Sequence, residues 1–172
     1  AAALRLAVTG AAGYLGREIA ALAAEEGHSV RAVVKSGQVV HGLPAACELL
    51  VVEDLTDPAA AREAADGTDA VIHTASVFRK IDDMDSDLVA PNIELAEQMV
   101  CACAASTSRL VLTSSMAAVR GAGQRPRNGL AYTSDDWNGV SRRDGPGFEP
   151  YQFSKAQAER RAWELTGLLG GE

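Results

Sequence analysis

The stretch TGAAGYLG, residues 9–16, decides which fold this chain can adopt. It follows an apolar run at residues 4–8, which is typical of a short buried strand in a parallel sheet. It also opens a helical pattern of apolar residues over residues 14–26, with Gly27 in the position where helices stop. The sequence therefore predicts a strand, a glycine-rich turn and a helix in immediate succession.

The glycines of this stretch each have a physical role in a turn that binds a nucleotide. Gly10 permits the tight turn off the strand, Gly13 lets the backbone approach a pyrophosphate, and Gly16 lets the helix pack close to the sheet. The pyrophosphate of a dinucleotide then lies against the helix N-terminus. An ordinary glycine-rich turn is the alternative, which the position directly after a strand makes less favourable. The rest of the candidate cofactor-binding turn is Ala12, Tyr14 and Leu15.

Strands and helices alternate along most of the chain. Further strands are expected at residues 30–34, 47–52, 70–74 and 109–113, and further helices at 58–65, about 87–105 and 151–165. This alternation predicts one α/β domain over residues 1–172, a Rossmann-type doubly wound parallel sheet with right-handed crossovers. Between residues 116 and 150 the pattern breaks, and a loop of that length in a compact domain is usually functional or mobile.

Composition limits the classes of partner. The chain has 172 residues, 47% of them hydrophobic, and a net charge of −7, which argues against nucleic acid as a partner. No apolar run approaches the ~20 residues that span a bilayer, and no signal peptide is visible, so no membrane partner is expected. The cysteines, Cys47, Cys101 and Cys103, are odd in number and lack redox-motif spacing. A reduced, cytoplasmic protein without a metal site is the simplest interpretation.

A second motif, YQFSK at residues 151–155, carries reactive side chains. It places the phenol of Tyr151 and the ammonium of Lys155 four residues apart, on one face of the predicted helix. Together with the glycine turn, this pair predicts hydride chemistry on a carbonyl or alcohol. Tyr151 would transfer a proton, and Lys155 would favour its phenolate.

The end of the second predicted strand indicates which nicotinamide cofactor is bound. An acidic residue there would bind the ribose hydroxyls of NAD, and a basic residue would accept the 2′-phosphate of NADP. Arg31 and Lys35 stand in this region, and no carboxylate follows before Glu48. The sequence therefore favours NADP(H) over NAD(H), with a solvated strand edge as the alternative.

Small and polar residues follow the third and fourth predicted strands. Asp54, followed by Leu55, can approach the adenine amine or begin a turn, whereas Asp57 is expected to cap the next helix. His73 is expected to be a core residue. The nicotinamide ribose is expected to approach Thr74, Ala75 and Ser76.

The fifth predicted strand ends in Thr113, Ser114 and Ser115, again at the edge where open α/β sheets bind ligands. A serine hydroxyl there can donate to a substrate carbonyl or cap a strand end. In the irregular stretch that follows, Trp137 can line a pocket or anchor the loop. The arginines of this stretch can bind an anionic substrate group, with solvated loop charges as the more ordinary reading: Arg120, Arg125, Arg127, Arg142 and Arg143.

These separated motifs, in this order, resemble those of the extended short-chain dehydrogenases/reductases. The arrangement is most similar to the dihydroflavonol reductase and cinnamoyl-CoA reductase group, which includes related aldehyde reductases. The glycine turn, Asp54-Leu55, the TSS run at 113–115 and the Tyr151–Lys155 pair with Glu159 carry the resemblance. Leu95 and Val77 depart from it, because members of the group often have glycine and proline there.

The resemblance implies a catalytic set of serine, tyrosine and lysine. Tyr151 would be the general acid, Lys155 its partner and a ribose ligand, and Ser115 the carbonyl donor, with Ser114 left open. It also implies a small-molecule carbonyl or alcohol substrate and a homodimer. Members of the group continue into further strands and a C-terminal substrate-binding domain, so the chain is expected to be an N-terminal fragment.

Three functions stay open on the sequence alone. The first is an NADPH-dependent carbonyl reductase. The second is an NAD-linked sugar epimerase or dehydratase, or an enzyme like the 3β-hydroxysteroid dehydrogenases, for which an acidic residue after the second strand would be expected. The third is a non-catalytic NADP-sensing regulator, and such proteins often lose the tyrosine–lysine pair that this chain keeps.

Overall fold

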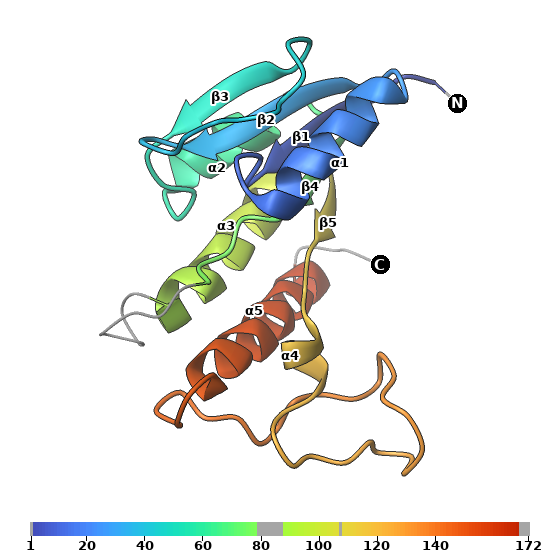
Figure 1. Ribbon diagram of the computed structural model, residues 1–172, viewed down its shortest axis with the longest axis vertical. Helices are drawn as coiled ribbons and strands as arrows, with labels where there is room; N and C mark the ends of the chain where they lie inside the picture. The colour runs from blue at the N-terminus through green and yellow to red at the C-terminus, as the bar shows by residue number, and fades with distance from the viewer. Residues whose placement is uncertain (1, 79–87, 107, 169–172) are drawn as a thin grey trace. The chain divides into compact units, whose positions relative to one another are not determined.

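The computed structural model describes residues 2–78, 88–106 and 108–168. The chain divides into two compact units. The first comprises residues 1–76 and 98–113, and the second comprises residues 77–97 and 114–172. Figure 1 shows the elements of both.

The first unit is built on a five-stranded parallel sheet in the order β3-β2-β1-β4-β5. The order reverses beside β1, which is where open α/β sheets bind ligands. Each predicted strand is present, with ends that shift by at most one residue, and the predicted Rossmann-type sheet is confirmed. The strands are β1 (Arg5–Thr9), β2 (Ser29–Lys35), β3 (Glu48–Val52), β4 (Ala70–His73) and β5 (Arg109–Leu112).

Two helices, α1 (Tyr14–Glu25) and α2 (Pro58–Ala65), cover opposite faces of this sheet (Figure 1). Their buried positions are small residues, which let the helix backbones approach the strands closely. Ala20 and Ala23 of α1 pack with Leu6, Val8 and Val30. The predicted cap of α2 is confirmed, because the Asp57 carboxylate accepts a hydrogen bond from the Ala59 backbone N–H at 3.0 Å.

The second unit contains the helices α4 (Met116–Val119) and α5 (Glu149–Leu168), which pack on each other. A further helix, α3 (Ala90–Ser106), begins in this unit and ends in the first. The short helix α4 was not predicted. Helix α5 begins two residues earlier than predicted, because Pro150 is well suited to the first turn of a helix. Residue 87, the predicted start of α3, lies outside the described residues.

The long irregular segment between α4 and α5 is held by buried polar side chains. The backbone N–H of the buried Asn138 donates to the Ala118 carbonyl at 2.7 Å, and its side-chain amide donates to the Ala117 carbonyl at 2.8 Å. The buried Asp136 carboxylate accepts the backbone N–H of Arg127 at 2.6 Å. Trp137 lies outside the lining of the cavity beside Tyr151 described below, and it lines a second cavity within the loop. The Arg160 guanidinium lies over its ring, 4.9 Å from the centroid.

Among the helices that the structure describes, none has the length and the apolar character needed to span a bilayer.

Candidate active site

The candidate site residues fall into two groups, one in each unit. The glycine turn and the ends of β1 to β4 belong to the first unit, and the tyrosine–lysine helix with the two serines belongs to the second.

The glycine turn after β1 is a region of close backbone approach. Gly10 has φ +70°, a conformation that favours glycine, and a Cβ there would lie 2.9 Å from the Ala75 nitrogen. A Cβ on Gly16 would lie 2.3 Å from the Gly10 carbonyl oxygen and 2.8 Å from the Thr74 hydroxyl. Gly10 therefore forms the tight turn, and Gly16 allows the close packing, as the sequence predicts. The packing partners of Gly16 are the turn itself and the end of β4.

The N-terminus of α1 is open to a ligand. Gly13 is its N-cap residue, no side chain forms a cap hydrogen bond, and the first turn contains no acidic residue. Tyr14 is 84% exposed, and Leu15 is exposed as well. Backbone N–H groups at a helix N-terminus attract an anion, because the helix dipole adds to their partial positive charge. The turn therefore fits a pyrophosphate, with Gly13 at the point of approach.

The ends of β1 and β4 are joined by hydroxyl groups. The Thr74 hydroxyl donates to the Thr9 carbonyl at 2.7 Å, and the Thr9 hydroxyl lies 2.8 Å from Nδ1 of the buried His73. His73 is therefore a core residue, as predicted. The Ala75 backbone N–H donates weakly to the Thr9 hydroxyl at 3.4 Å, and Ser76 is exposed. These bonds set the distance between the glycine turn and the 74–76 segment.

Arg31 and Lys35, proposed from the sequence for a 2′-phosphate, lie in different surroundings. The Arg31 guanidinium bonds to the Glu48 carboxylate at 3.1 Å and to the Asp66 carbonyl at 2.8 Å, so it is engaged along the sheet and α2. Lys35 Nζ lies 2.7 Å from the Asp54 carboxylate, and both side chains are about half exposed. The geometry favours Lys35 over Arg31 for binding an anion.

The expectation that no carboxylate lies near these cations is wrong. Strands β2 and β3 pair in parallel with Lys35 opposite Val52 and Arg31 opposite Glu48. That register brings Glu48 to Arg31, and it brings Asp54, which follows β3, to Lys35. Neither pair is evident from sequence spacing, because the partners are 17 and 19 residues apart. Parallel pairing of the second and third predicted strands was the signal from which they could have been inferred.

Asp54 also begins a turn, as one of the two predicted readings had it. Its carboxylate accepts the backbone N–H of Thr56 at 3.0 Å. Burial raises the pKa of Asp54, but the hydrogen bonds from Lys35 and Thr56 outweigh burial and hold the pKa below its usual value. Leu55 is buried in the core, so only its backbone is available to a cofactor.

Tyr151 and Lys155 lie one turn apart on α5, so their side chains share a face. Tyr151 is half-buried, and its ring makes an edge contact with Phe78 at 4.7 Å between centroids. Lys155 is buried, and burial lowers the pKa of its ammonium, while the Glu159 carboxylate acts in the opposite direction. An ammonium in these surroundings is a partly desolvated charge, one helical turn after Tyr151.

The two candidate serines have different hydrogen-bond partners. Ser114 donates to the Glu159 carboxylate, so its proton is engaged. Ser115 caps α4 by accepting the Ala117 backbone N–H at 3.1 Å. Because a hydroxyl that accepts a bond keeps its own proton to donate, the geometry favours Ser115 as the carbonyl donor. Thr113 continues the β4–β5 ladder by donating its backbone N–H to the His73 carbonyl at 3.0 Å.

Two buried residues that the sequence analysis did not select position this region. The Asn92 side chain accepts the Val77 backbone N–H at 2.8 Å, donates to the Val77 carbonyl at 3.0 Å and reaches the Ser154 hydroxyl at 3.2 Å. Ser154 in turn donates to the Tyr151 carbonyl at 2.8 Å. An asparagine inside a predicted helix was the available signal, because such a residue needs partners when it is buried.

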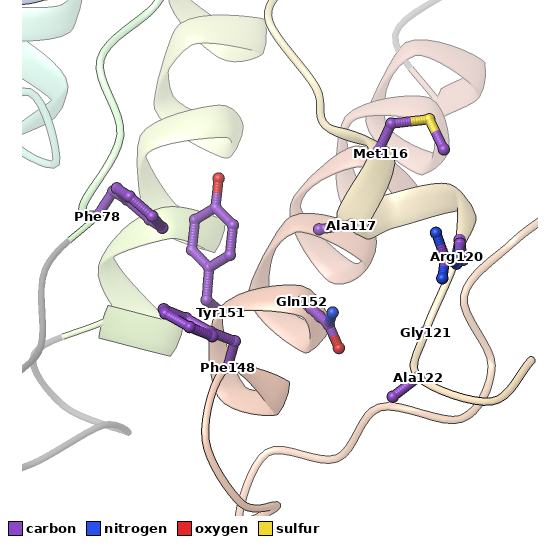
Figure 2. Close-up of a pocket in the computed structure, with 9 residues that line it drawn as sticks. All are labelled: Phe78, Met116, Ala117, Arg120, Gly121, Ala122, Phe148, Tyr151 and Gln152. Atoms are coloured by element: carbon purple, nitrogen blue, oxygen red, sulfur yellow. The ribbon is translucent and has the colours of Figure 1, made fainter.

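A cavity of about 530 Å³ opens beside Tyr151. Figure 2 shows Phe78 and Phe148 beside the tyrosine ring, Met116 and Arg120 across from them, and Gln152 between. Ala117, Gly121 and Ala122 complete the lining. Ligand pockets commonly have volumes of about 300–1,000 Å³, so the cavity can take a small organic molecule. Among the described residues, no cluster of metal-ligating side chains is found.

Comparisons with known proteins identify a family and several relatives. Residues 10–161 match a family described as NAD(P)H-binding. The fatty acid hydroxylase uhd1 of Mycosarcoma maydis is 33% identical over 174 residues, which cover 96% of the chain and 56% of that protein. Dihydroflavonol 4-reductase of Hordeum vulgare is 31% identical over 95% of the chain and 49% of that protein.

A solved structure has the same fold. The yeast methylglyoxal/isovaleraldehyde reductase Gre2, complexed with NADPH, superposes with a TM-score of 0.82 at 26% identity, over 96% of the chain and 53% of that structure. The chain spans about half the length of these relatives.

Proposed function

The chain belongs to the NAD(P)H-binding family, and on this basis we propose that it carries the cofactor turn and the proton donor of an NADPH-dependent oxidoreductase. The reaction would reduce an aldehyde or ketone to an alcohol. One observation carries the proposal: Tyr151 lines a cavity of substrate size, and the buried Lys155 follows one helical turn later. Relatives named as reductases, among them one complexed with NADPH, support it.

The cofactor would be held by residues of the first unit. The open N-terminus of α1 and the glycine turn suit the pyrophosphate, and Lys35 suits a 2′-phosphate. When it is bound, NADPH supplies the hydride that reduces the carbonyl carbon. Asp54 would then exchange its bond to Lys35 for solvent or for the adenine.

Tyr151 would supply the proton. Its phenol donates to the carbonyl oxygen as that oxygen becomes an alkoxide, and the phenolate that remains is stabilised by the Lys155 ammonium. Burial lowers the pKa of the Lys155 ammonium, and the Glu159 carboxylate offsets part of that effect. Ser115 would donate a second hydrogen bond to the same oxygen, which places the developing charge between two donors.

A second candidate is an NAD-linked epimerase or dehydrogenase built from the same parts. The carboxylate of Asp54, which follows β3 and lies 2.7 Å from Lys35 at the end of β2, favours it, because a carboxylate there can accept from ribose hydroxyls. A non-catalytic regulator is disfavoured, because Tyr151 and Lys155 are both retained. A cytoplasmic location and a homodimer stay predictions. Free Cys47, Cys101 and Cys103 support the reducing compartment.

The test is turnover by the full-length protein with NADPH and a panel of aldehydes and ketones. Tyr151→Phe removes the transferable proton and keeps the ring in its packing. We expect turnover to fall by about 10²- to 10⁴-fold, with NADPH binding nearly unchanged. A variant that kept more than a tenth of the activity, a barrier change below ~1.4 kcal/mol, would rule Tyr151 out as the general acid.

A further inference from the structure

We propose that the cavity beside Tyr151 takes a carbonyl compound with an apolar, preferably aromatic body and a carboxylate, and that Arg120 binds this carboxylate. The inference rests on the proposed function for the position of the reacting carbonyl at Tyr151. It adds the chemical class of the substrate and a residue that determines specificity.

The apolar half of the cavity is unusually open. Phe78, Phe148 and Met116 are 67%, 71% and 62% exposed, and all three line the same cavity as Tyr151 (Figure 2). Large apolar side chains gathered around one hollow mark a binding site, because a solvated surface gains nothing from holding them together. Aromatic walls suit a flat apolar body, which stacks against the ring faces or edges.

Arg120 supplies the only cation among the described residues that line the cavity. No ion pair joins it to a carboxylate in the described part of the chain. Its guanidinium lies over the Tyr132 ring, 5.9 Å from the centroid, and the Tyr132 hydroxyl donates to the Gln124 carbonyl. The arginine is thus supported by an anchored aromatic ring, while its charge stays available to an anion.

The backbone that carries Arg120 is fixed. The Arg120 N–H donates to the Met116 carbonyl at 2.9 Å and ends α4. At the next residue, a Cβ on Gly121 would lie 2.4 Å from Val140 Cγ2 and 2.5 Å from Asn138 Oδ1. Only a glycine lets the chain pass this close to Asn138, which itself bonds to the Ala117 and Ala118 carbonyls. A fixed cation across from Tyr151 can select a substrate by its length.

The charge of the lining favours a carboxylate over a phosphate. One guanidinium, with the neutral amide of Gln152 nearby, matches a single negative charge and can bind a carboxylate with two parallel hydrogen bonds. A phosphate carries nearly two charges and is usually held by several donors. Arg125 and Arg127, the next arginines along the loop, line a different cavity together with Asp135 and Asp136.

The experiment measures binding separately from turnover. The full-length protein, saturated with NADP+, is titrated in a calorimeter with 4-formylbenzoate, with its methyl ester and with 4-formylphenyl phosphate. We expect the carboxylate to bind at least about tenfold more tightly than the ester, because one charge-assisted contact corresponds to about ten- to a hundredfold. The preference should shrink at high salt, since Arg120 is exposed.

Variants assign the preference to Arg120. Arg120→Gln should remove it while changing ester binding less than about twofold, and Arg120→Lys should keep part of it. Arg125→Gln replaces a loop arginine outside this cavity and is the matched control. It should leave the affinity for the acid and for the ester unchanged. Thermal unfolding of each variant shows whether it is folded.

Three results would overturn the inference. The first is equal affinity for the acid and the ester. The second is an equal fall in both affinities in Arg120→Gln. The third is an affinity for the phosphate more than tenfold higher than that for the carboxylate. Turnover with NADPH reports on the reaction itself. Selective binding without turnover would reject the proposed reduction and keep the anion subsite. Equal turnover of acid and ester would reject the subsite and keep the reduction.

Discussion

The glycine turn after β1 and the loop between α4 and α5 both lie beside candidate binding residues, but they are held by different means. The turn is held by the absence of side chains: Gly10 and Gly16 bring backbone atoms closer than any Cβ would allow. The loop is held by polar side chains. The buried Asp136 and Asn138 bind backbone groups of the loop and of α4 that would otherwise be paired within a strand or a helix. The turn therefore fails when an atom is added, and the loop fails when a hydrogen bond is removed.

Gly16→Ala should have the largest effect, because it adds an atom where the turn has no room. The new Cβ would meet the Gly10 carbonyl oxygen at 2.3 Å, so the backbone must move. We expect a strain of about 3 kcal/mol, at the upper end for overpacking, and a loss of NADPH affinity above about a hundredfold. Fluorescence titration with NADPH measures this loss. Gly139→Ala is the control, because a Cβ there meets nothing within 4 Å. Equal affinities for the two variants would contradict the steric argument.

Lys35→Gln should weaken NADPH binding by about ten- to a hundredfold and leave NADH binding unchanged, since one charge-assisted contact to the 2′-phosphate is lost. Arg62→Gln, an exposed arginine on α2, is the matched control. Dissociation constants for both cofactors, at low and high salt, decide the matter. If the unmutated protein bound NADH as tightly as NADPH, the NAD-linked alternative would gain the advantage.

Asn138→Ala tests the loop by removing its central anchor. The Ala117 carbonyl loses its partner, so α4 and Arg120 should shift. We expect KM for the carbonyl substrate to rise by about tenfold, because small displacements near a reacting group are costly, while NADPH affinity stays constant. Steady-state kinetics combined with NADPH titration separates these effects. If NADPH affinity fell as much as KM rose, the loop would support the fold of the whole chain rather than the cavity alone.

The smallest effect concerns the pair of Lys35 and Asp54. The folded state lowers the pKa of Asp54, so the pair stabilises the fold above the ordinary Asp pKa of about 3.9, and this contribution disappears as the pH falls through the folded pKa. Both side chains are about half exposed, so the contribution should stay below about 1 kcal/mol. Urea unfolding of the unmutated protein and Asp54→Asn should differ at pH 7, and the difference should disappear as the pH falls below the ordinary Asp pKa of about 3.9 and through the folded pKa. A difference that grew on acidification would contradict this account.

Local rules in the sequence predicted most of the first unit. The apolar runs gave the strands, Asp57 gave a cap, and the glycine spacing gave the turn, because each of these features depends on neighbours in the chain. The resemblance to the extended short-chain dehydrogenases/reductases is confirmed by the family match and the relatives.

Long-range contacts explain what the sequence could not provide. The bond between Ser114 and Glu159 joins residues 45 positions apart, and it engages the proton of the Ser114 hydroxyl. The pairing of Lys35 with Asp54 depends on strand register, and the burial of Asn92 depends on tertiary packing. None of these follows from spacing along the chain, since the partners meet only after folding. The assignments of Ser115, Tyr151 and Lys155 to catalysis stay predictions.

The side chain of Asn92 binds both the N–H and the carbonyl of Val77, as a neighbouring strand would. Val77 belongs to no strand, yet its amide hydrogen should exchange with deuterated solvent at the slow rate of a sheet residue. Because Phe78 follows directly and packs on Tyr151, that exchange rate would report, without any substrate, how firmly the cavity wall beside Tyr151 is held.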